Sequence, residues 1–126
     1  MSKKVINTTN APAPIGPYNQ AIEVNGMIFI SGQIPLNPST SELVTNNIED
    51  EATQVMENLK AILTEAGLTF DHVVKTSIFL SDMNLFGPVN TVYARYFTDN
   101  FPARETVAVL GLPKDVHVEI SMIVAR

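Results

Sequence analysis

The sequence contains no cysteine among its 126 residues, and only 17% of its side chains are charged. The absence of cysteine excludes a disulfide framework, a thiolate-bound zinc ion and a cysteine nucleophile. The charged fraction is low, because an average soluble domain carries roughly 25%. Since a small protein has a large surface relative to its volume, we expect part of this surface to face another chain rather than water.

Basic side chains are also few, with eight Lys and Arg against 13 acidic residues and a formal net charge of −5. Proteins that bind nucleic acid draw much of their affinity from basic side chains on phosphates, so this balance argues against such a partner. No apolar run approaches the roughly 20 residues of a membrane-spanning helix. Lys3 and Lys4 are not followed by the apolar run of a signal peptide. We therefore expect a cytoplasmic protein with one domain over residues 1–126 and no membrane partner.

Common catalytic and metal-binding motifs are missing as well. His72 and His117 are the two histidines, and neither has a second ligand at helical or strand spacing. The glycines are single and lie where turns are expected, so no phosphate-binding loop is present. We therefore do not expect a metal site.

The apolar pattern predicts an α+β domain in the order strand, strand, helix, strand, helix, strand, strand. Asn25-Gly26 lies between two apolar segments and indicates a tight hairpin. Apolar residues recur at a three-and-four spacing over residues 48–66, which is typical of an amphipathic helix that Gly67 ends. The acidic run Glu49-Asp50-Glu51 is expected to be the solvated start of this helix.

The second helix is expected after residues 81–84, with an apolar stripe that runs to Phe97 and includes Tyr93. The two helices then cover one face of a mixed sheet. The strands are expected at residues 18–24, 27–30, 73–80, 104–110 and 116–124, with an additional strand near residues 3–7.

The most informative polar residues lie in the last two predicted strands. By strand alternation Arg104 and Thr106 share one face of their strand, and Glu119 lies on the polar face of the last one. A hairpin of these strands would bring Arg104 close to Glu119. One interpretation is a surface ion pair worth about 0–1 kcal/mol. The other is an arginine that grips a substrate carboxylate beside a glutamate that acts as general acid or base.

Several short motifs follow one another along nearly the whole chain: Ile15-Gly16-Pro17-Tyr18, Ser31-Gly32-Gln33-Ile34-Pro35, Val89-Asn90, Pro102-Ala103-Arg104, Leu112-Pro113 and Val118-Glu119-Ile120. In this order they resemble the RidA (YjgF/YER057c/UK114) family of reactive enamine/imine deaminases. The resemblance implies a chorismate-mutase-like fold of the bacillus type, which assembles as a homotrimer. Three sheets would line a central barrel, and three ligand clefts would lie between subunits.

The resemblance also implies a hydrolase that uses no cofactor, a 2-iminobutanoate/2-iminopropanoate deaminase. Such an enzyme converts 2-enamine and 2-imine acids, such as 2-aminoacrylate and 2-aminocrotonate, to 2-keto acids and ammonia. These reactive intermediates are released by pyridoxal-phosphate-dependent serine/threonine dehydratases, so the implied role is metabolite damage control.

The family's site residues can be carried over to this sequence by position. Arg104 would bind the substrate carboxylate, with the backbone N–H of Thr106 as a second donor. Glu119 would hold and activate the attacking water as general base. The remaining matches line the family's cleft or the loop beside it, and they are Tyr18, Ser31, Gly32 and Asn90.

Two positions depart from the usual family pattern. Glu105 stands where many relatives carry Ser or Thr, and by alternation it points away from Arg104. Thr106 stands where relatives often carry Cys, a harmless change if only its backbone N–H is used.

Two other functions stay open. One is a non-catalytic regulatory trimer that binds a 2-keto acid, and the other is an endoribonuclease or translation inhibitor, which the acidic charge balance disfavours.

Overall fold

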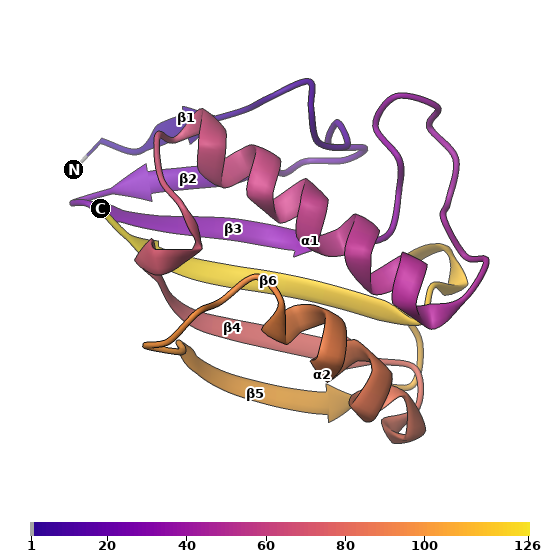
Figure 1. Cartoon of the computed structure of the whole chain (residues 1–126). Helices are drawn as coiled ribbons and strands as arrows, with labels where there is room; N and C mark the ends of the chain where they lie inside the picture. The colour runs from indigo at the N-terminus through magenta and orange to yellow at the C-terminus, as the bar shows by residue number, and fades with distance from the viewer. Residues whose placement is uncertain (1) are drawn as a thin grey trace.

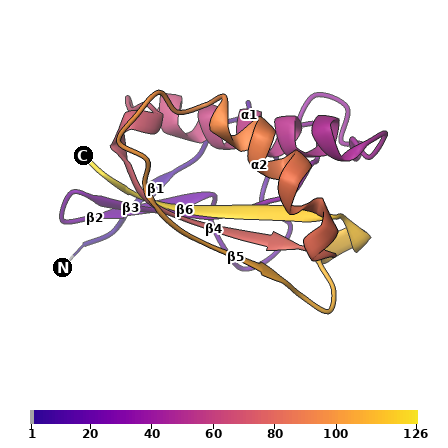
Figure 2. The ribbon, with the colours of Figure 1, turned by 60° about the horizontal axis from the view of Figure 1, so that its bottom comes forward.

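A computed structural model describes residues 2–126 of the chain and contains, within that range, a six-stranded mixed sheet and two α-helices (Figure 1). Both helices lie on the same side of the sheet, as the sequence pattern predicts (Figure 2). The helices are α1 (Ile48–Glu65) and α2 (Phe86–Ala94). The strands are β1 (Lys4–Ile6), β2 (Ala21–Val24), β3 (Met27–Gln33), β4 (Val73–Leu80), β5 (Ala103–Ala108) and β6 (Val118–Ala125).

The strands lie in the order β1-β2-β3-β6-β4-β5. The predicted hairpin of the last two strands is wrong, because β5 pairs in parallel with β4 and β6 lies between β3 and β4. The helical connection through α2 carries the chain back over the sheet, which is how a parallel neighbour is reached. The last strand then enters the centre, where its apolar face is buried on the helix side: Val118, Ile120, Met122 and Val124.

The hairpin of β2 and β3 forms around Asn25 and Gly26, with positive φ angles of 51° and 75°. A type I′ turn needs both angles positive, so the prediction from Asn-Gly is confirmed. The strand before the turn begins at Ala21 rather than at residue 18. The reason lies in Gln20, whose buried side chain accepts from the Thr8 N–H and donates to the carbonyl of Pro12, so that it holds the loop between β1 and β2.

Helix α1 begins where the sequence predicts and ends at Glu65, one residue before the predicted end. Asn47 caps its start by accepting a hydrogen bond from the Asp50 N–H at 2.8 Å. Gly67, with φ of 76°, follows its end. The apolar stripe packs on the sheet and is at most 1% exposed at Ala52, Val55, Met56, Leu59, Ile62 and Leu63.

Glu51 is a correction to the expected solvated helix start, because it is buried. Its Oε1 accepts a hydrogen bond from the His117 N–H at 2.8 Å, and its Oε2 lies 2.9 Å from Nδ1 of the same histidine. Glu51 precedes the buried Ala52 and lies one turn before Val55, so the helix turns it toward the sheet. The carboxylate therefore fixes the start of α1 to the segment before β6.

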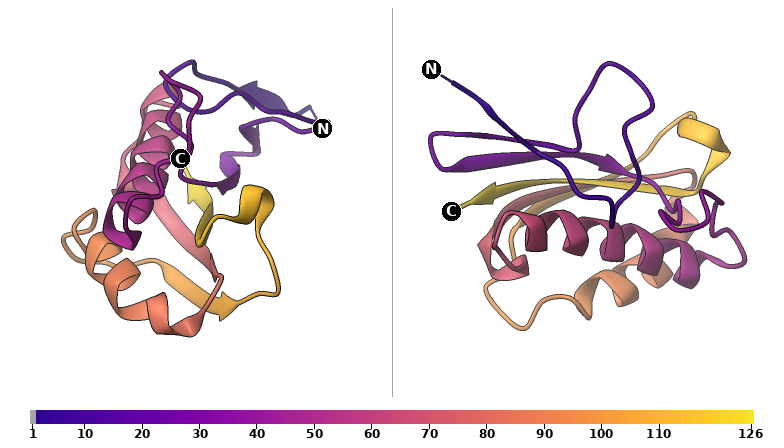
Figure 3. Two further views of the ribbon diagram at one scale, coloured as in Figure 1. Left: turned by 90° about the vertical axis from the view of Figure 1, so that its right-hand side faces the viewer. Right: turned by 90° about the horizontal axis from the view of Figure 1, so that it is seen from above.

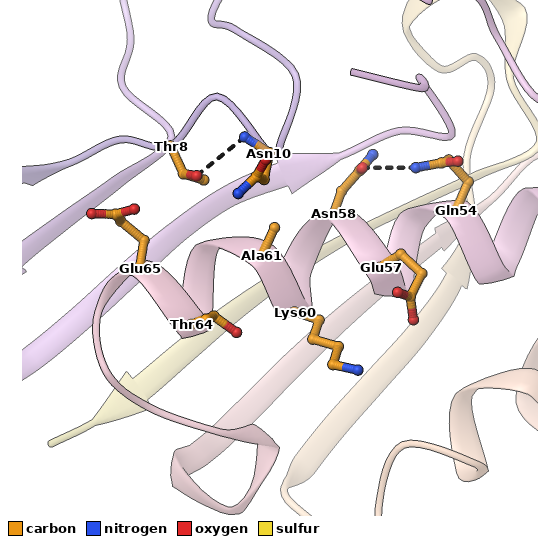
Figure 4. A pocket seen from close by; sticks show the side chains of 9 residues that line it. All are labelled: Thr8, Asn10, Gln54, Glu57, Asn58, Lys60, Ala61, Thr64 and Glu65. Atoms are coloured by element: carbon orange, nitrogen blue, oxygen red, sulfur yellow. Dashed lines mark hydrogen bonds between the residues drawn. The ribbon is translucent and has the colours of Figure 1, made fainter. Parts of the chain in front are cut away.

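The sheet face away from the helices carries exposed apolar side chains. Phe29 of β3 is 45% exposed and Val107 of β5 is 41% exposed. Part of the loop between β1 and β2 projects on this side of the sheet (Figure 3), whereas Thr8 and Asn10 of the same loop lie beside α1 (Figure 4). No helix among residues 2–126 is both long enough and apolar enough to cross a membrane.

Candidate active site

Arg104 lies on the edge strand β5 and extends toward α2. In the parallel register of β4 and β5 it stands opposite Thr76, whose side chain is buried on the helix side of the sheet. The Arg104 Nη1 donates a hydrogen bond to Asn90 Oδ1 at 2.7 Å. Its guanidinium carbon lies 5.5 Å from the centre of the Phe86 ring and 5.2 Å from that of the Tyr93 ring. One face of α2, with residues spaced by four and three, therefore holds the guanidinium group.

A cleft of about 460 Å³ opens beside this arginine. An arginine carries five N–H donors in a planar fork, and one of them is used by Asn90, so others remain for a ligand. A planar carboxylate is the group that this fork fits best. The cleft is lined by Asn90, Tyr93, Ala94, Phe101, Pro102 and Arg104.

Thr106 shares the helix side of β5 with Arg104, because it stands opposite the buried Ile78. Its Oγ1 is shielded from water and has no hydrogen-bond partner within residues 2–126. Glu105, between the two, lies on the other side of the sheet. There its carboxylate accepts from the Ser77 hydroxyl and lies 3.2 Å from the Lys75 ammonium group, and these two partners lower the pKa of Glu105.

Glu119 lies on β6, with its side chain on the sheet face away from the helices. Burial of its carboxyl group raises the pKa of Glu119 above its ordinary value. Gly32 lies directly beside it, since a Cβ added at Gly32 would be 2.8 Å from both Cδ and Oε2 of Glu119. The absence of a side chain at Gly32 therefore makes room for the Glu119 carboxylate.

Ser31 and Tyr18 belong to the same region of the chain. The Ser31 hydroxyl donates to the carbonyl of Asn19 at 2.6 Å, and the Ser31 N–H donates to the carbonyl of Gln20 at 2.9 Å. These bonds tie β3 to the segment that follows Tyr18. The Tyr18 residue is 50% exposed, and its ring lies near Gly16 at the end of the loop between β1 and β2.

One chain does not bring Arg104 and Glu119 together. Arg104 stands opposite Thr76 of β4, and Glu119 stands opposite Phe79 of the same strand. Positions three residues apart on a strand point to opposite faces of a sheet, so the two side chains are separated by β4 and by the sheet itself. The expectation that a hairpin would set them side by side is wrong for a single chain.

The residues named from the sequence therefore form two half-sites. The first lies between β5 and α2, at one edge of the sheet: Asn90, Arg104 and Thr106. The second lies around the start of β6 and the end of β3, with Glu119 on the opposite face, Gly32 beside it, Ser31 next to Gly32, and Tyr18 in the segment bonded to Ser31. Sequence reasoning missed the contacts of Phe86 and Tyr93 with the guanidinium group. Their spacing with Asn90 along one helix face is the signal that could have found them.

The two largest hollows of the described residues lie away from both half-sites. One, of about 490 Å³, lies between α1 and the segment of Thr8 and Asn10, and most of its lining side chains are polar, with Gln54 bonded to Asn58 (Figure 4). The other, of about 580 Å³, lies between the segment of residues 7–15 and the loop of residues 36–41. Neither contains a residue that the sequence motifs single out, apart from Ile15 in the second.

The fold and the site define a small α+β domain with an arginine-centred cleft at the edge of its sheet and a half-buried carboxylate on the opposite face. The chain belongs to the RidA family: residues 8–126 match the family model described as Endoribonuclease L-PSP, and its relatives include a Rid family protein and a 2-iminobutanoate/2-iminopropanoate deaminase. The resemblance seen in the sequence motifs is thereby confirmed.

Three relatives illustrate the family. The 2-iminobutanoate/2-iminopropanoate deaminase of Mus musculus is 48% identical over 124 residues, which cover 98% of this chain and 92% of the mouse protein. The crystal structure of YyfA, a Rid family protein from Yersinia pestis, is 51% identical with a TM-score of 0.97, over 99% of this chain and 100% of that one. TdcF from E. coli with bound serine is 41% identical with a TM-score of 0.93, over 98% of each chain.

Proposed function

We propose that the protein hydrolyses reactive 2-imine and 2-enamine acids, such as 2-iminobutanoate and 2-iminopropanoate, to 2-keto acids and ammonia. The observation that carries the proposal is the guanidinium group of Arg104, held by Asn90 at 2.7 Å beside an open cleft. The mouse relative is named for this activity, and the E. coli relative was crystallised with serine, an amino acid with a free carboxylate. Both fit a site built around a carboxylate-binding arginine.

In this proposal Arg104 binds the substrate carboxylate. The bond to Asn90 orients the guanidinium fork, and the backbone N–H of Thr106 donates to the same carboxylate as a neutral partner. Lysine in place of Arg104 would not serve equally, because its single ammonium group cannot bind the two carboxylate oxygens side by side.

We further propose that the working site is shared between neighbouring subunits of a homotrimer. A ligand that contacts both Arg104 and Glu119 needs two copies of the chain, because the two side chains lie on opposite faces of one sheet. The exposed Phe29 and Val107 on the uncovered face support an assembly that buries this face. The neighbour would then supply the second half-site of Tyr18, Ser31, Gly32 and Glu119.

Glu119 is the general base of the proposed reaction. It takes a proton from a bound water while the water oxygen forms a bond to C2 of the protonated imine, and the C=N π electrons move to nitrogen. The resulting carbinolamine then loses ammonia as the C–N bond breaks. Glu119 returns its proton to the leaving nitrogen, and its carboxylate then accepts the hydroxyl proton as the C2 carbonyl forms. The raised pKa of Glu119 favours it as a base, since its carboxylate holds a proton more strongly than an exposed one.

The chemistry requires little beyond placement. A protonated imine carbon is already electrophilic, so the site has to fix the carboxylate end of the substrate and position one water.

Because such imines are short-lived in water, we propose that the protein acts in the cytoplasm beside the dehydratases that release them. Its role there would be the removal of damaging metabolites.

A coupled assay tests the proposal. A threonine dehydratase and threonine supply the imine, and the release of 2-oxobutanoate is followed with and without the purified protein. We expect the protein to accelerate this release and Arg104→Ala to abolish the acceleration. Arg95→Ala is the matched control, because Arg95 is an exposed arginine after α2 and should leave the rate unchanged. Equal rates with and without the wild-type protein would contradict the proposal.

The same experiment separates the two alternative functions. A non-catalytic regulatory trimer would bind 2-oxobutanoate saturably without accelerating its formation. An endoribonuclease is suggested by the description of the family model. The formal net charge of −5 disfavours it, and RNA cleavage that disappears in Arg104→Ala would be needed to support it.

A further inference from the structure

Tyr93 differs from Phe86, the other aromatic residue that contacts Arg104, because its hydroxyl group is held by a hydrogen bond. Its hydroxyl lies 2.9 Å from the Thr76 hydroxyl, and the two residues are only 4% and 1% exposed. Thr76 is also the direct partner of Arg104 in the register of β4 and β5. One buried hydrogen bond therefore connects the strand beside Arg104 to the ring that lies against its guanidinium group.

Arg104 itself is long and flexible, and a free arginine side chain loses much rotational freedom when it binds a ligand. The flat face of the Tyr93 ring, whose centre lies 5.2 Å from the guanidinium carbon, limits the positions that the group can take before any ligand arrives. Burial raises the pKa of Tyr93, so its hydroxyl stays protonated and can share its proton with Thr76. A binding group that is ordered in advance binds more tightly, because less freedom is lost.

We propose that Tyr93 is a positioning residue for Arg104. The Thr76 hydroxyl holds the tyrosine ring, and the ring face holds the guanidinium group so that its free N–H donors point into the cleft toward a ligand carboxylate. This inference deepens the proposed function and rests on it for the identity of the ligand. The positioning itself does not depend on catalysis.

The test compares four variants with the wild type. Tyr93→Leu removes the ring, and Tyr93→Phe keeps the ring but loses the hydroxyl. Thr76→Val removes the anchor with little change of shape. Tyr96→Leu is the matched control, because Tyr96 lies three residues further along and bonds Glu57 rather than contacting Arg104.

For each variant the Kd for 2-oxobutanoate is measured by titration calorimetry, and KM and kcat are measured in the coupled assay. We expect Tyr93→Leu to raise Kd and KM about tenfold, because it removes both the cation–π contact with the exposed guanidinium group and the hydrogen bond to Thr76. Tyr93→Phe and Thr76→Val should each raise them about threefold, as for one lost buried hydrogen bond. In all three kcat should change less than Kd, whereas Tyr96→Leu should lower only Tm. A purely structural role of Tyr93 would instead reduce kcat through loss of folded protein and leave KM unchanged.

A second readout does not need a ligand. The NMR order parameter of the Arg104 Nε–H bond should fall from about 0.8 in the wild type to below roughly 0.6 in Tyr93→Leu. If the wild type neither binds 2-oxobutanoate nor accelerates its release, the proposed function fails, while the order parameter still decides the inference. Unchanged Kd, KM and order parameter in Tyr93→Leu would overturn the inference. If that variant does not fold, unchanged values in both Tyr93→Phe and Thr76→Val would overturn it.

Discussion

Gly32→Ala offers a sharp test of how the Glu119 carboxylate is placed. The added Cβ would lie 2.8 Å from Cδ and Oε2 of Glu119 and 3.0 Å from Cγ, whereas unbonded carbon atoms rest roughly 3.5–4.0 Å apart. The glutamate side chain must therefore move by about 1 Å, and leaving its preferred rotamer costs about 0.5–1.5 kcal/mol. Because the carboxylate is at the end of a flexible side chain, it can move while the backbone of the sheet keeps its position.

The consequence should appear in the chemical step. A displacement of about 1 Å at a catalytic group can lower the rate on the order of a hundredfold. We therefore expect kcat for imine hydrolysis to fall by about ten- to a hundredfold in Gly32→Ala. KM should change little, because Arg104 binds the carboxylate from the other half-site. Tm should fall by only a few degrees, as about 1 kcal/mol shifts Tm by roughly 4 °C in a domain of this size.

The assay is the steady-state coupled reaction, with thermal unfolding measured on the same samples. Gly111→Ala is the control, because a Cβ there meets no atom within 4 Å. Wild-type kcat in a folded Gly32→Ala protein would refute the reasoning, since it would mean that the position of the Glu119 carboxylate does not limit the reaction.

Three further predictions concern assembly, stability and pH. Phe29→Glu places a charge on the uncovered sheet face and should convert a trimer to monomers in light scattering with the fold retained, while an unchanged mass would argue against this interface. Glu51→Gln should lower the free energy of unfolding by about 1–3 kcal/mol in urea titrations, because the His117 N–H loses a buried charged acceptor, whereas Glu49→Gln on the exposed helix start should have little effect. The acid limb of kcat should lie above the ordinary value of 4.5, because burial raises the pKa of Glu119 and only its deprotonated form is a base. That limb should disappear in Glu119→Gln, and its persistence would assign it to another group. The free energy of unfolding should change in the opposite direction with pH. Because burial favours the protonated form of Glu119, the resulting stabilisation is fully present below pH 4.5 and is lost as the pH rises through the raised pKa.

Local features of the fold could be predicted from the sequence because nearby residues determine them. The Asn25-Gly26 turn follows from the two positive φ angles that this turn type requires. Helix α1 follows from its apolar spacing and from the cap at Asn47. The resemblance of the motif around Arg104 to the family predicts a carboxylate-binding arginine. This role stays a prediction, and the structure adds the bond from Arg104 to Asn90.

Long-range pairing could not be predicted in the same way. An apolar strand near the end of a chain gives no sign of which strands will flank it, so the position of β6 between β3 and β4 was missed. With it the relation of Arg104 to Glu119 was missed, because their separation depends on the register of both with β4. The role of Tyr93 was hidden for a similar reason, since a buried aromatic residue on a helix is usually only part of the core.

Complementation between two inactive variants tests the shared site most directly. Arg104→Ala and Glu119→Gln are unfolded together, refolded as a mixture of equal parts and assayed, with each variant refolded alone as control. In a random trimer each cleft takes its arginine from one chain and its glutamate from the next, so about a quarter of the clefts should be complete. We predict recovery of about a quarter of the activity of refolded wild-type protein. A mixture as inactive as the two separate variants would contradict the claim that Arg104 and Glu119 of different chains act on one substrate.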